Sequence, residues 1–530
     1  MSLLPLDDPA WGPWPWPAKV TPLYPAQETA INEIVSHFER GIRVVALDAP
    51  TGSGKTVVAE AVRRRLQSRA LYVCIDRGLQ DQFASDFTFA ALLKGRRNYP
   101  TLNRPEVFGV EPFLTCEDCD LDVGVCSYCD EPDICPYRAA KRRALGADLA
   151  CVNTAYFLRE ANSAGGLSSW PLVVADEADR LEGALMLSVE VEFNRRRLTL
   201  WGLEHPRNDI AMWLQGVLPL ALADAQYRAS LLPSDDVQVR RDARRAKEFL
   251  ARVSLLVEEY QRGGWVCCDV KGGGVAFRPV MVNTVGPSAL WAHSARWLLM
   301  SATLLGTARL LRALGWAERF AVVQMPSTFP VARRPLYVWP VADNVKAKQA
   351  ESLPKLVGAI EQILQRHPQE RILIHTVSFR LLEELREHLV SSRLHFYESM
   401  RALPRTLAAY LSQLDGVLVA PALERGLDLP DGACRVIVVS KVPYPDLGDA
   451  QVAARMALPG GREWYLDQAL RALVQMTGRG MRHAEDRCVS YLLDAQVRRL
   501  LRQHGDRLPR WWREAIVTIR GLEKVPHGTR

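Results

Sequence analysis

Short apolar runs bounded by loop residues recur through the first half of the chain. Runs of this length and content are typical of strands buried in the middle of a sheet. Helical patterns separate several of the runs, and strands that alternate with helices predict a parallel sheet. The runs are Val44–Leu47, Leu71–Ile75, Leu149–Val152, Leu172–Ala175 and Trp297–Met300.

A second series of the same kind follows in the second half of the chain. It predicts a second parallel sheet, and we expect the two sheets to be structurally alike, which makes the fold class α/β. Residues 1–24, rich in Pro and Trp, are expected to form an irregular arm packed on the first domain. The runs of the second series are Arg371–Ile374, Val417–Ala420, Arg435–Val439 and Cys488–Leu493.

Two segments interrupt the first series, and the 530 residues suit three or four domain-sized units. One segment is rich in cysteine, and the other has a helical pattern that includes the arginine-rich stretch Asp235–Lys247. The expected units are a first sheet domain over 1–95, 149–190 and 263–328, a cysteine-rich insertion over 96–148, a helical insertion over 191–262, and a second sheet domain over 329–530.

The first predicted strand leads into a phosphate-binding loop, Ala49–Thr56, and a helical pattern follows it. Glycines at 52 and 54 allow the backbone to turn its N–H groups toward phosphate. Lys55 is expected to reach the β- and γ-phosphates, and the Thr56 hydroxyl to ligate Mg²⁺. The strictest form of the pattern begins with Gly, and here Ala49 stands in that place. The predicted nucleotide-binding residues are Thr51, Gly52, Ser53, Gly54, Lys55 and Thr56.

Two further stretches complete a nucleotide site. The strand Leu172–Ala175 ends in Asp176 and Glu177, which suit holding Mg²⁺ and deprotonating an attacking water. Late in the chain, Gln475–Arg482 presents Arg479 and Arg482 with a spacing that places both on one helix face. We expect these arginines to reach the transferred phosphoryl group from the second domain. This layout predicts a motor that closes two domains on one nucleoside triphosphate.

Composition narrows the class of protein. Hydrophobic residues make up 48% of the chain and charged residues 24%, as in an ordinary globular protein. The formal charge of +7 is compatible with nucleic-acid binding. No apolar run is long enough to cross a bilayer and the N-terminus lacks a signal-peptide pattern, so we expect a cytoplasmic protein without membrane contact. Eleven cysteines in that compartment favour metal binding or free thiols over disulfides.

Five cysteines lie close together, and four thiolates can hold either zinc or an iron–sulfur cluster. The two CxxC pairs suit tetrahedral zinc and leave the fifth cysteine unused. The alternative uses the last three with one of the first two, and the spacing does not decide between them. Cys74, Cys151, Cys434 and Cys488 are expected in the core, and Cys267 and Cys268 in packing. The clustered cysteines are Cys116, Cys119, Cys126, Cys129 and Cys135.

These motifs, in their order, resemble those of iron–sulfur superfamily 2 helicases of the XPD/DinG type over nearly the whole chain. The carboxylate motif Asp176–Asp179 reads DEAD here, where most family members carry DEAH. The matching stretches are Tyr24–Gln27 (Gln motif), Ala49–Thr56 (motif I), Leu79–Gln82 (motif Ia), Cys135–Lys141, Val152–Tyr156, Asp176–Asp179 (motif II), Met300–Leu304 (motif III), Glu424–Asp428 (motif V) and Gln475–Arg482 (motif VI).

The resemblance implies two RecA-like motor domains, an iron–sulfur insertion and a small helical Arch-like insertion. It favours a [4Fe–4S] cluster over zinc. Many relatives carry the first cluster cysteine after a stretch like Gly95–Pro100, where this chain has Thr101, so Cys116 or Cys119 must take that place. No appended exonuclease domain is expected, since the chain begins at the motor.

The implied activity is that of an ATP-dependent DNA helicase that moves 5′ to 3′ on single-stranded DNA, unwinds forked duplexes and serves DNA repair, with ATP, Mg²⁺ and the cluster as cofactors. A monomer is expected. One alternative is a nucleic-acid-stimulated ATPase that remodels protein–DNA or RNA–DNA complexes without processive unwinding, and another is a zinc-bearing binding module with a vestigial ATPase. The implied catalytic residues are Lys55, Asp176, Glu177, Gln475, Arg479 and Arg482.

The resemblance also assigns roles around the nucleotide. Gln27 is implied to contact adenine, and Asp428 lies where it can sense nucleotide and DNA, as can Glu424. Ser301 and Thr303 are expected to link the nucleotide site to the DNA groove. DNA contacts should be mostly to phosphate, hence independent of sequence and sensitive to salt. The candidates for these contacts are Arg96, Arg97, Arg138, Lys141, Arg142 and Arg143.

Overall fold

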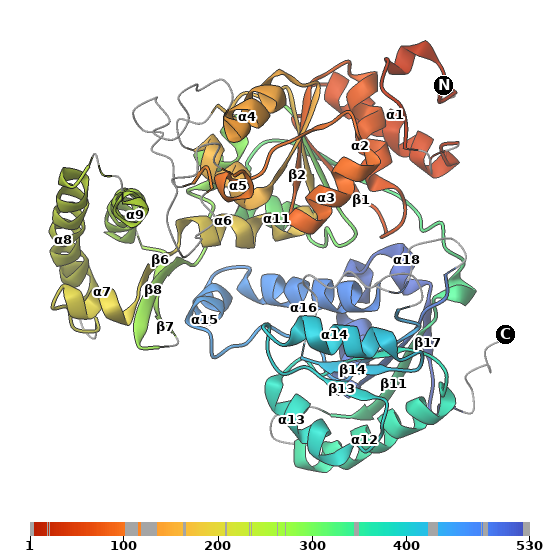
Figure 1. Cartoon of the computed structure of the whole chain (residues 1–530). Coiled ribbons are helices and arrows are strands. Elements are labelled where there is room, and N and C mark those ends of the chain that lie inside the picture. Colours follow the sequence, from red (N-terminus) through yellow and green to blue (C-terminus); the bar gives the residue numbers. More distant parts are fainter. Residues whose placement is uncertain are drawn as a thin grey trace.

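Two parallel sheets organise the molecule, each covered by helices, and a smaller unit projects from the first (Figure 1). None of the described helices combines the length and the apolar content needed to traverse a bilayer. The computed structural model describes residues 5–17, 20, 22–100, 115–117, 135–162, 166–206, 209–232, 234, 236–261, 263–270, 272–343, 349–421, 433–478, 480 and 486–522.

The sheet of the first sheet domain (domain 1) has seven strands in the order β10-β1-β9-β5-β2-β4-β3, and all neighbours pair in parallel. All five strands predicted from apolar runs are present, within a residue of the predicted ends. The strands at the two edges, β3 and β10, were not indicated by such runs. The strands are β1 (Val44–Asp48), β2 (Ala70–Cys74), β3 (Ala91–Leu92), β4 (Leu149–Asn153), β5 (Leu172–Asp176), β9 (Trp297–Ser301) and β10 (Phe320–Gln324).

Both faces of this sheet are buried, because successive side chains of a strand point to opposite sides. Val44 and Ala46 of β1 belong to one hydrophobic cluster, and Val45 and Leu47 belong to the other. The covering helices are α1 (Pro25–Glu39), α2 (Lys55–Arg65), α3 (Arg77–Asp86), α4 (Pro136–Gly146), α5 (Thr154–Ala161), α6 (Leu181–Val189), α10 (Gly286–Ala289) and α11 (Thr307–Ala313).

The N-terminal arm packs on domain 1, as the sequence predicts. Trp11 is buried in the cluster that contains α1 and α2. The guanidinium groups of Arg63 and Arg64, on α2, lie over the rings of Trp14 and Trp16 at 4.5 and 4.0 Å from the ring centroids. Cation–π contacts and burial therefore hold the arm in place.

The helical insertion is larger than the expected range of 191–262. Its helices share one core with a three-stranded antiparallel sheet of order β6-β8-β7, to which Val275 and Phe277 contribute. The hairpin at residues 265–279 therefore packs with the insertion and not with domain 1, where the predicted boundary had placed it. The elements are β6 (Val191–Phe193), α7 (Arg195–Leu200), α8 (Ile210–Ser230), α9 (Val237–Gln261), β7 (Trp265–Val270) and β8 (Gly274–Pro279).

The second sheet domain (domain 2) contains the second parallel sheet, in the order β13-β14-β12-β15-β16-β11-β17. Numbered within each domain, the strands of both sheets follow one order, 3-4-2-5-6-1-7. The predicted likeness of the two sheets is thus confirmed. The strands are β11 (Leu336–Ala342), β12 (Ile372–His375), β13 (Leu394–Phe396), β14 (Val417–Ala420), β15 (Val436–Val439), β16 (Val489–Asp494) and β17 (Ile516–Thr518).

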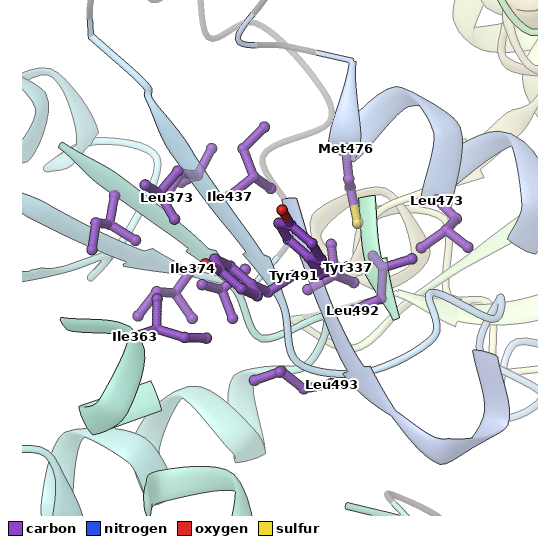
Figure 2. Packing of buried hydrophobic residues seen from close by; sticks show 14 of the residues in the cluster. Tyr337, Ile363, Leu373, Ile374, Ile437, Leu473, Met476, Tyr491, Leu492 and Leu493 are labelled. Atoms are coloured by element: carbon purple, nitrogen blue, oxygen red, sulfur yellow. The ribbon is translucent and has the colours of Figure 1, made fainter. Parts of the chain in front are cut away.

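The core of domain 2 joins this sheet to its helices (Figure 2). Tyr337 of β11 stacks on Tyr491 of β16 with ring centroids 5.5 Å apart. Leu473 and Met476 enter the same core from α16. The helices are α12 (Gln349–Arg366), α13 (Phe379–His388), α14 (Leu403–Ser412), α15 (Ala450–Ala457), α16 (Gly461–Thr477), α17 (Ala495–His504) and α18 (Arg510–Arg513).

Helix α15 connects domain 2 to domain 1 and its insertion. The side chain of Arg455 forms a buried ion pair of 2.9 Å with Glu182 of α6 and donates to the carbonyl oxygen of Val280 at 3.0 Å. Arg278 of β8 pairs with Glu190 and with Asp449, the residue that caps α15. The hairpin of the insertion therefore lies against domain 2.

Candidate nucleotide site between the two motor domains

The phosphate loop joins β1 to α2 in the way the sequence predicts. Gly52 and Gly54 have positive φ angles of 75° and 77°, which only glycine adopts readily. A Cβ atom on Gly54 would also overlap the side-chain nitrogen of Gln27. Helix α2 begins at Lys55, so its unpaired N–H groups and dipole favour an anion at this point. The Lys55 ammonium donates to the carbonyl oxygen of Ala49 at 3.4 Å.

Gln27 of α1 is hydrogen-bonded to this loop. Its side chain is only 3% exposed. The amide oxygen accepts from the Tyr24 backbone N–H at 2.9 Å, and the amide nitrogen donates to the Ser53 carbonyl at 2.9 Å. Gln27 thus ties the start of α1 to the loop, while the adenine contact implied by the resemblance stays a prediction.

The two carboxylates of motif II lie at the end of β5. Oδ1 of Asp176 accepts from the Glu177 N–H at 3.0 Å, and Oδ2 accepts from the Tyr72 hydroxyl at 3.0 Å. Glu177 has a φ of 49°, so the chain turns sharply directly after the strand. Burial raises the pKa of Asp176, and burial with the nearby Asp179 raises the pKa of Glu177 to about 7. Such carboxylates favour a nearby cation, because a positive charge stabilises their ionised forms.

Asp48 adds a third acid that motif reasoning missed. It is the last residue of β1, and burial raises its pKa to about 7 although Lys55 opposes the shift. Gln324 of β10 donates to its Oδ2 at 3.4 Å. The signal in the sequence is an acidic residue directly between an apolar strand and the phosphate loop.

A network centred on Asp179 joins the two domains. Its carboxylate accepts from the Ser301 hydroxyl at 2.6 Å and the Thr303 hydroxyl at 3.1 Å, both in motif III. Gln475 of domain 2 donates from its amide nitrogen to Asp179 at 2.8 Å and to Thr303 at 3.1 Å. The structure therefore brings motifs II, III and VI into direct contact.

Helix α16 presents one polar face to domain 1. Asp467, Arg471 and Gln475 are four residues apart, so they lie on the same side of the helix. Asp467 pairs with Arg309 at 2.6 Å, and Arg471 donates to the Leu305 carbonyl at 2.6 Å. Sequence reasoning missed both contacts, although the four-residue spacing back from Gln475 could have indicated them.

The predicted arginines follow this helix. Arg479 and Arg482 lie outside the described residues, as do Glu424 and Asp428 of motif V. Helix α16 ends at Thr477, and the shared helix face expected for the two arginines stays a prediction. The indole N–H of Trp512 donates to the Thr477 hydroxyl at 2.7 Å and fixes this end of the helix.

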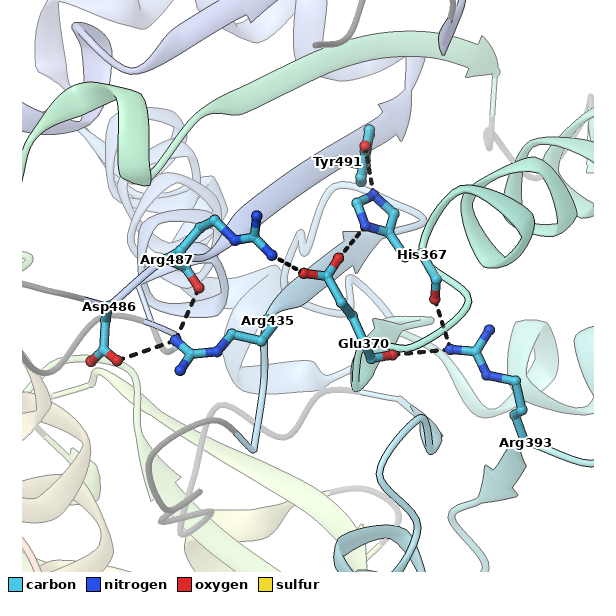
Figure 3. A network of polar contacts seen from close by, with 7 residues as sticks. All are labelled: His367, Glu370, Arg393, Arg435, Asp486, Arg487 and Tyr491. Carbon is cyan, nitrogen blue, oxygen red and sulfur yellow. Dashed lines mark hydrogen bonds and ion pairs between the residues drawn. The ribbon is translucent and has the colours of Figure 1, made fainter. Parts of the chain in front are cut away.

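A polar network anchors the chain directly after that segment (Figure 3). Arg435 donates to the Asp486 carboxylate at 3.1 Å and to the Arg487 carbonyl at 3.2 Å. Arg487 pairs in turn with Glu370, which also contacts His367 at 2.5 Å. Hydrogen bonds from these partners outweigh burial and lower the pKa of Glu370.

Two cysteines of the predicted metal centre converge. The sulfur atoms of Cys116 and Cys135 are 3.9 Å apart, and both residues are buried. Two ligands of one metal centre must approach in this way, so the pair fits either zinc or a cluster. Cys119, Cys126 and Cys129 lie outside the described residues, and among the described ones no three potential metal ligands gather.

The other cysteines follow the prediction. Cys74 and Cys151, on neighbouring strands β2 and β4, are buried with their sulfurs 3.6 Å apart, and Cys434 and Cys488 are buried in the core of domain 2. Cys268 is buried and Cys267 is half-buried in the insertion.

The basic candidates for DNA contact lie around α4. Arg142 and Arg143 are exposed on this helix. Lys141 pairs with Glu160 and Arg97 pairs with Glu117, so part of this basic charge is balanced within the protein. The Arg96 guanidinium lies 5.4 Å from the ring centroid of Tyr137.

Comparison with known proteins agrees with this geometry. A helicase C-terminal domain model matches residues 360–515, and a model of the type III restriction enzyme res subunit matches residues 21–100. The ATP-dependent DNA helicase CHL1 of Kluyveromyces lactis is 27% identical over 172 residues, which cover 28% of this chain and 21% of the relative. The Fanconi anemia group J protein homolog of Gallus gallus is 25% identical over 30% of this chain and 15% of its own length.

Solved structures extend the likeness to the whole fold. An XPD helicase superposes with a TM-score of 0.60 over 94% of this chain and 100% of its own, at 16% identity. The Xpd4 structure of S. tokodaii gives 0.58 over 93% of this chain and 99% of its own, at 15% identity. Together, the two family models and the curated helicases support the resemblance to XPD/DinG-like superfamily 2 helicases, and the solved structures show that the fold is that of XPD.

Proposed function

We propose that this chain is an ATP-dependent DNA helicase that hydrolyses ATP between its two motor domains. The observation that carries the proposal is the network on Asp179, in which Gln475 of domain 2 bonds directly to motifs II and III of domain 1. A bond network that spans both domains can respond to nucleotide in the cleft and transmit closure.

In this proposal the phosphates lie on the loop Thr51–Thr56 at the N-terminus of α2, with Lys55 on the β- and γ-phosphates. Thr56 and Asp176 hold Mg²⁺, which neutralises charge on the phosphate oxygens. Glu177, at the turn after β5, orients and deprotonates the attacking water. Its raised pKa favours a base that gains and releases a proton near neutral pH.

Domain 2 is proposed to supply the positive charge that faces the transferred phosphoryl group. Arg479 and Arg482 follow α16, whose polar face is bonded to domain 1 at Asp467 and Arg471. The network on Arg435 fixes the chain beyond them. We propose that both arginines stabilise charge on the transferred phosphoryl group, and that Asp428 and Gln27 complete nucleotide recognition.

The nucleic-acid side of the proposal rests on resemblance and on charge. Single-stranded and forked DNA are the proposed substrates, with 5′ to 3′ movement and with Arg142 and Arg143 at the exposed surface of α4. The alternative is an ATPase that remodels protein–DNA or RNA–DNA complexes. A [4Fe–4S] cluster held by Cys116, Cys126, Cys129 and Cys135 is proposed to fold the segment before α4 when bound. Approach of Cys116 to Cys135 favours Cys116 over Cys119 as the first ligand.

One experiment tests activity and polarity together. ATP hydrolysis is measured with and without single-stranded DNA, and strand displacement is measured on forked, 5′-tailed and 3′-tailed duplexes. The proposal predicts DNA-stimulated hydrolysis, displacement of forked and 5′-tailed duplexes, and loss of both in Lys55→Ala. Hydrolysis without displacement would favour the remodelling alternative, and no nucleotide hydrolysis would overturn the proposal.

The metal is tested separately on protein purified without oxygen. We expect four iron atoms per chain and a brown protein that Cys135→Ser bleaches. Stoichiometric zinc without visible absorbance would contradict the cluster and favour the two CxxC pairs.

A further inference from the structure

Tyr72 lies between the two residues proposed to hold Mg²⁺, and no motif includes it. Its hydroxyl donates to Oδ2 of Asp176 at 3.0 Å and lies 3.4 Å from the Thr56 hydroxyl. The residue is on β2, beside β5, and its side chain is 3% exposed. It therefore bridges the phosphate loop and motif II from within the sheet.

The ring of Tyr72 is held rigidly. It stacks on Phe83 of α3 with ring centroids 4.1 Å apart and an interplanar angle of 26°, and Phe83 packs in turn on Phe87. All three rings are buried. Because packing fixes the ring, the position of its hydroxyl is fixed as well.

The direction of the hydrogen bonds matters for cation binding. The single proton of the Tyr72 hydroxyl is used by Asp176, which can only accept in the ionised form that would bind a cation. Within the Thr56–Tyr72 contact, the Thr56 hydroxyl must then be the donor. This arrangement directs the proton of Thr56 toward Tyr72 and leaves the threonine oxygen lone pairs for a cation. Each oxygen of Asp176 has one protein donor and keeps lone pairs too.

We propose that Tyr72 is a positioning residue that orients Thr56 and Asp176 for Mg²⁺. This inference rests on the proposed ATP hydrolysis, because it concerns the metal of that reaction. Partners that orient metal ligands by hydrogen bonds commonly change metal affinity when removed, although they touch neither metal nor substrate. Phenylalanine at this position would fill the same space, so a residue needed only for packing would tolerate the change.

The test is equilibrium binding of a fluorescent ADP with and without Mg²⁺, in the wild type and Tyr72→Phe. We expect the gain in affinity that Mg²⁺ provides to fall about tenfold in the variant. Binding without Mg²⁺ should change less than about twofold, since the Tyr72 hydroxyl meets the phosphate loop at the Thr56 hydroxyl, which is proposed to serve the metal. In the ATPase assay, the Mg²⁺ concentration for half-maximal rate should rise in parallel.

Tyr410→Phe is the matched control. It removes another buried phenol hydroxyl, which donates to the Ala433 carbonyl within domain 2. It should leave the gain from Mg²⁺ unchanged. Phe83→Leu is a second variant, because it loosens the packing of the Tyr72 ring and leaves the Tyr72 hydroxyl in place. It should reduce the gain in ADP affinity from Mg²⁺ by a smaller factor than Tyr72→Phe does. If Tyr72→Phe does not fold, Phe83→Leu decides the question alone.

Two results would overturn the inference: an unchanged gain from Mg²⁺ in Tyr72→Phe, or equal weakening with and without Mg²⁺, which indicates a general structural role. Failure of the proposed function is distinguishable. A wild-type chain that binds ADP in a Mg²⁺-dependent manner but hydrolyses no ATP would contradict the proposed function, and the Tyr72 comparison would still be decided by binding.

Discussion

The two motor sheets share one strand order but differ in what stands at the ends of equivalent strands. The first strand of domain 1 ends in Asp48 and continues into the phosphate loop, whereas the first strand of domain 2 ends in Ala342 and continues into Asp343. The fifth strand of domain 1 ends in Asp176, and that of domain 2 ends in Val439. One fold thus serves two roles, because the chemistry lies in the loops that follow the strands.

Charged groups in the two domains also behave in opposite ways. In domain 1, Asp48 is buried and Asp176 and Glu177 are half-buried, Lys55 is their shared cation, and the pKa of each acid is raised. In domain 2, Glu370 accepts a hydrogen bond from His367 and forms an ion pair with Arg487, and its pKa is lowered. Glu370, Arg435 and Arg487 precede their strands, so they lie at the opposite edge of a parallel sheet from the strand ends (Figure 3). The three acids with a raised pKa thus lie at the carboxyl edge of the first sheet, and the ion-paired Glu370 lies at the opposite edge of the second.

Glu177 provides the strongest test of the contrast between the two sheets. Glu177→Gln should lower ATP turnover about a hundredfold or more while nucleotide binding is retained, because the amide cannot accept the proton of the water. The measurement is steady-state ATPase together with nucleotide affinity. Glu192→Gln, at an exposed position of β6, serves as the control. Near-normal turnover in Glu177→Gln would remove this residue from the role of base.

The next effect tests whether domain 2 acts through its contact with domain 1. Gln475→Ala removes the donor to Asp179 and Thr303 and should lower DNA-stimulated turnover about tenfold, with little change in thermal stability. The control is Gln496→Ala, whose amide contacts Asp343 within domain 2. Equal rates in both variants would show that the inter-domain bonds do not contribute to turnover.

Asp48→Asn tests the raised pKa. An acid whose folded pKa exceeds its ordinary 3.8 keeps its proton in the folded state, so the protein loses stability as pH rises from about 4 to about 7. The variant lacks this loss, so its free energy of unfolding at pH 8 should exceed that of the wild type by about 1–2 kcal/mol. Its melting temperature should be higher accordingly, and the difference should be smaller at pH 5. Melting curves without nucleotide measure it. A gain that is equal at both pH values would contradict the assignment.

Glu370→Gln tests the ion-paired network of Arg435, Arg487 and Glu370, where the pKa of the acid is lowered and not raised. A lowered pKa contributes stability above the ordinary value of 4.5, and this contribution is lost as pH falls through the folded value. The variant should be less stable than wild type by about 1 kcal/mol at pH 7, and the difference should close in acid. Unfolding by denaturant at several pH values measures it. A difference that grows in acid would show that the network does not lower this pKa.

The central strands and the site motifs could be predicted because each depends on a few consecutive residues. A strand buried on both faces is a continuous apolar run, and a phosphate loop is a fixed spacing of glycine, lysine and threonine. The edge strands β3, β10, β13 and β17 gave no such signal. An edge strand is short or partly exposed, as in β10, where buried and exposed residues alternate. The hairpin of the insertion was misplaced for a similar reason, since only packing against α8 and α9 shows which core it joins.

Local stretches of sequence were enough to predict the two parallel sheets, the phosphate loop, the motif II carboxylates and the family resemblance. Only the tertiary structure decided that Asp48 is buried beside them, that Tyr72 bridges Thr56 and Asp176, and that α16 bonds to domain 1 through Asp467, Arg471 and Gln475. Residues far apart in the chain meet at the carboxyl edge of a sheet, because strand order and not sequence distance sets their neighbours.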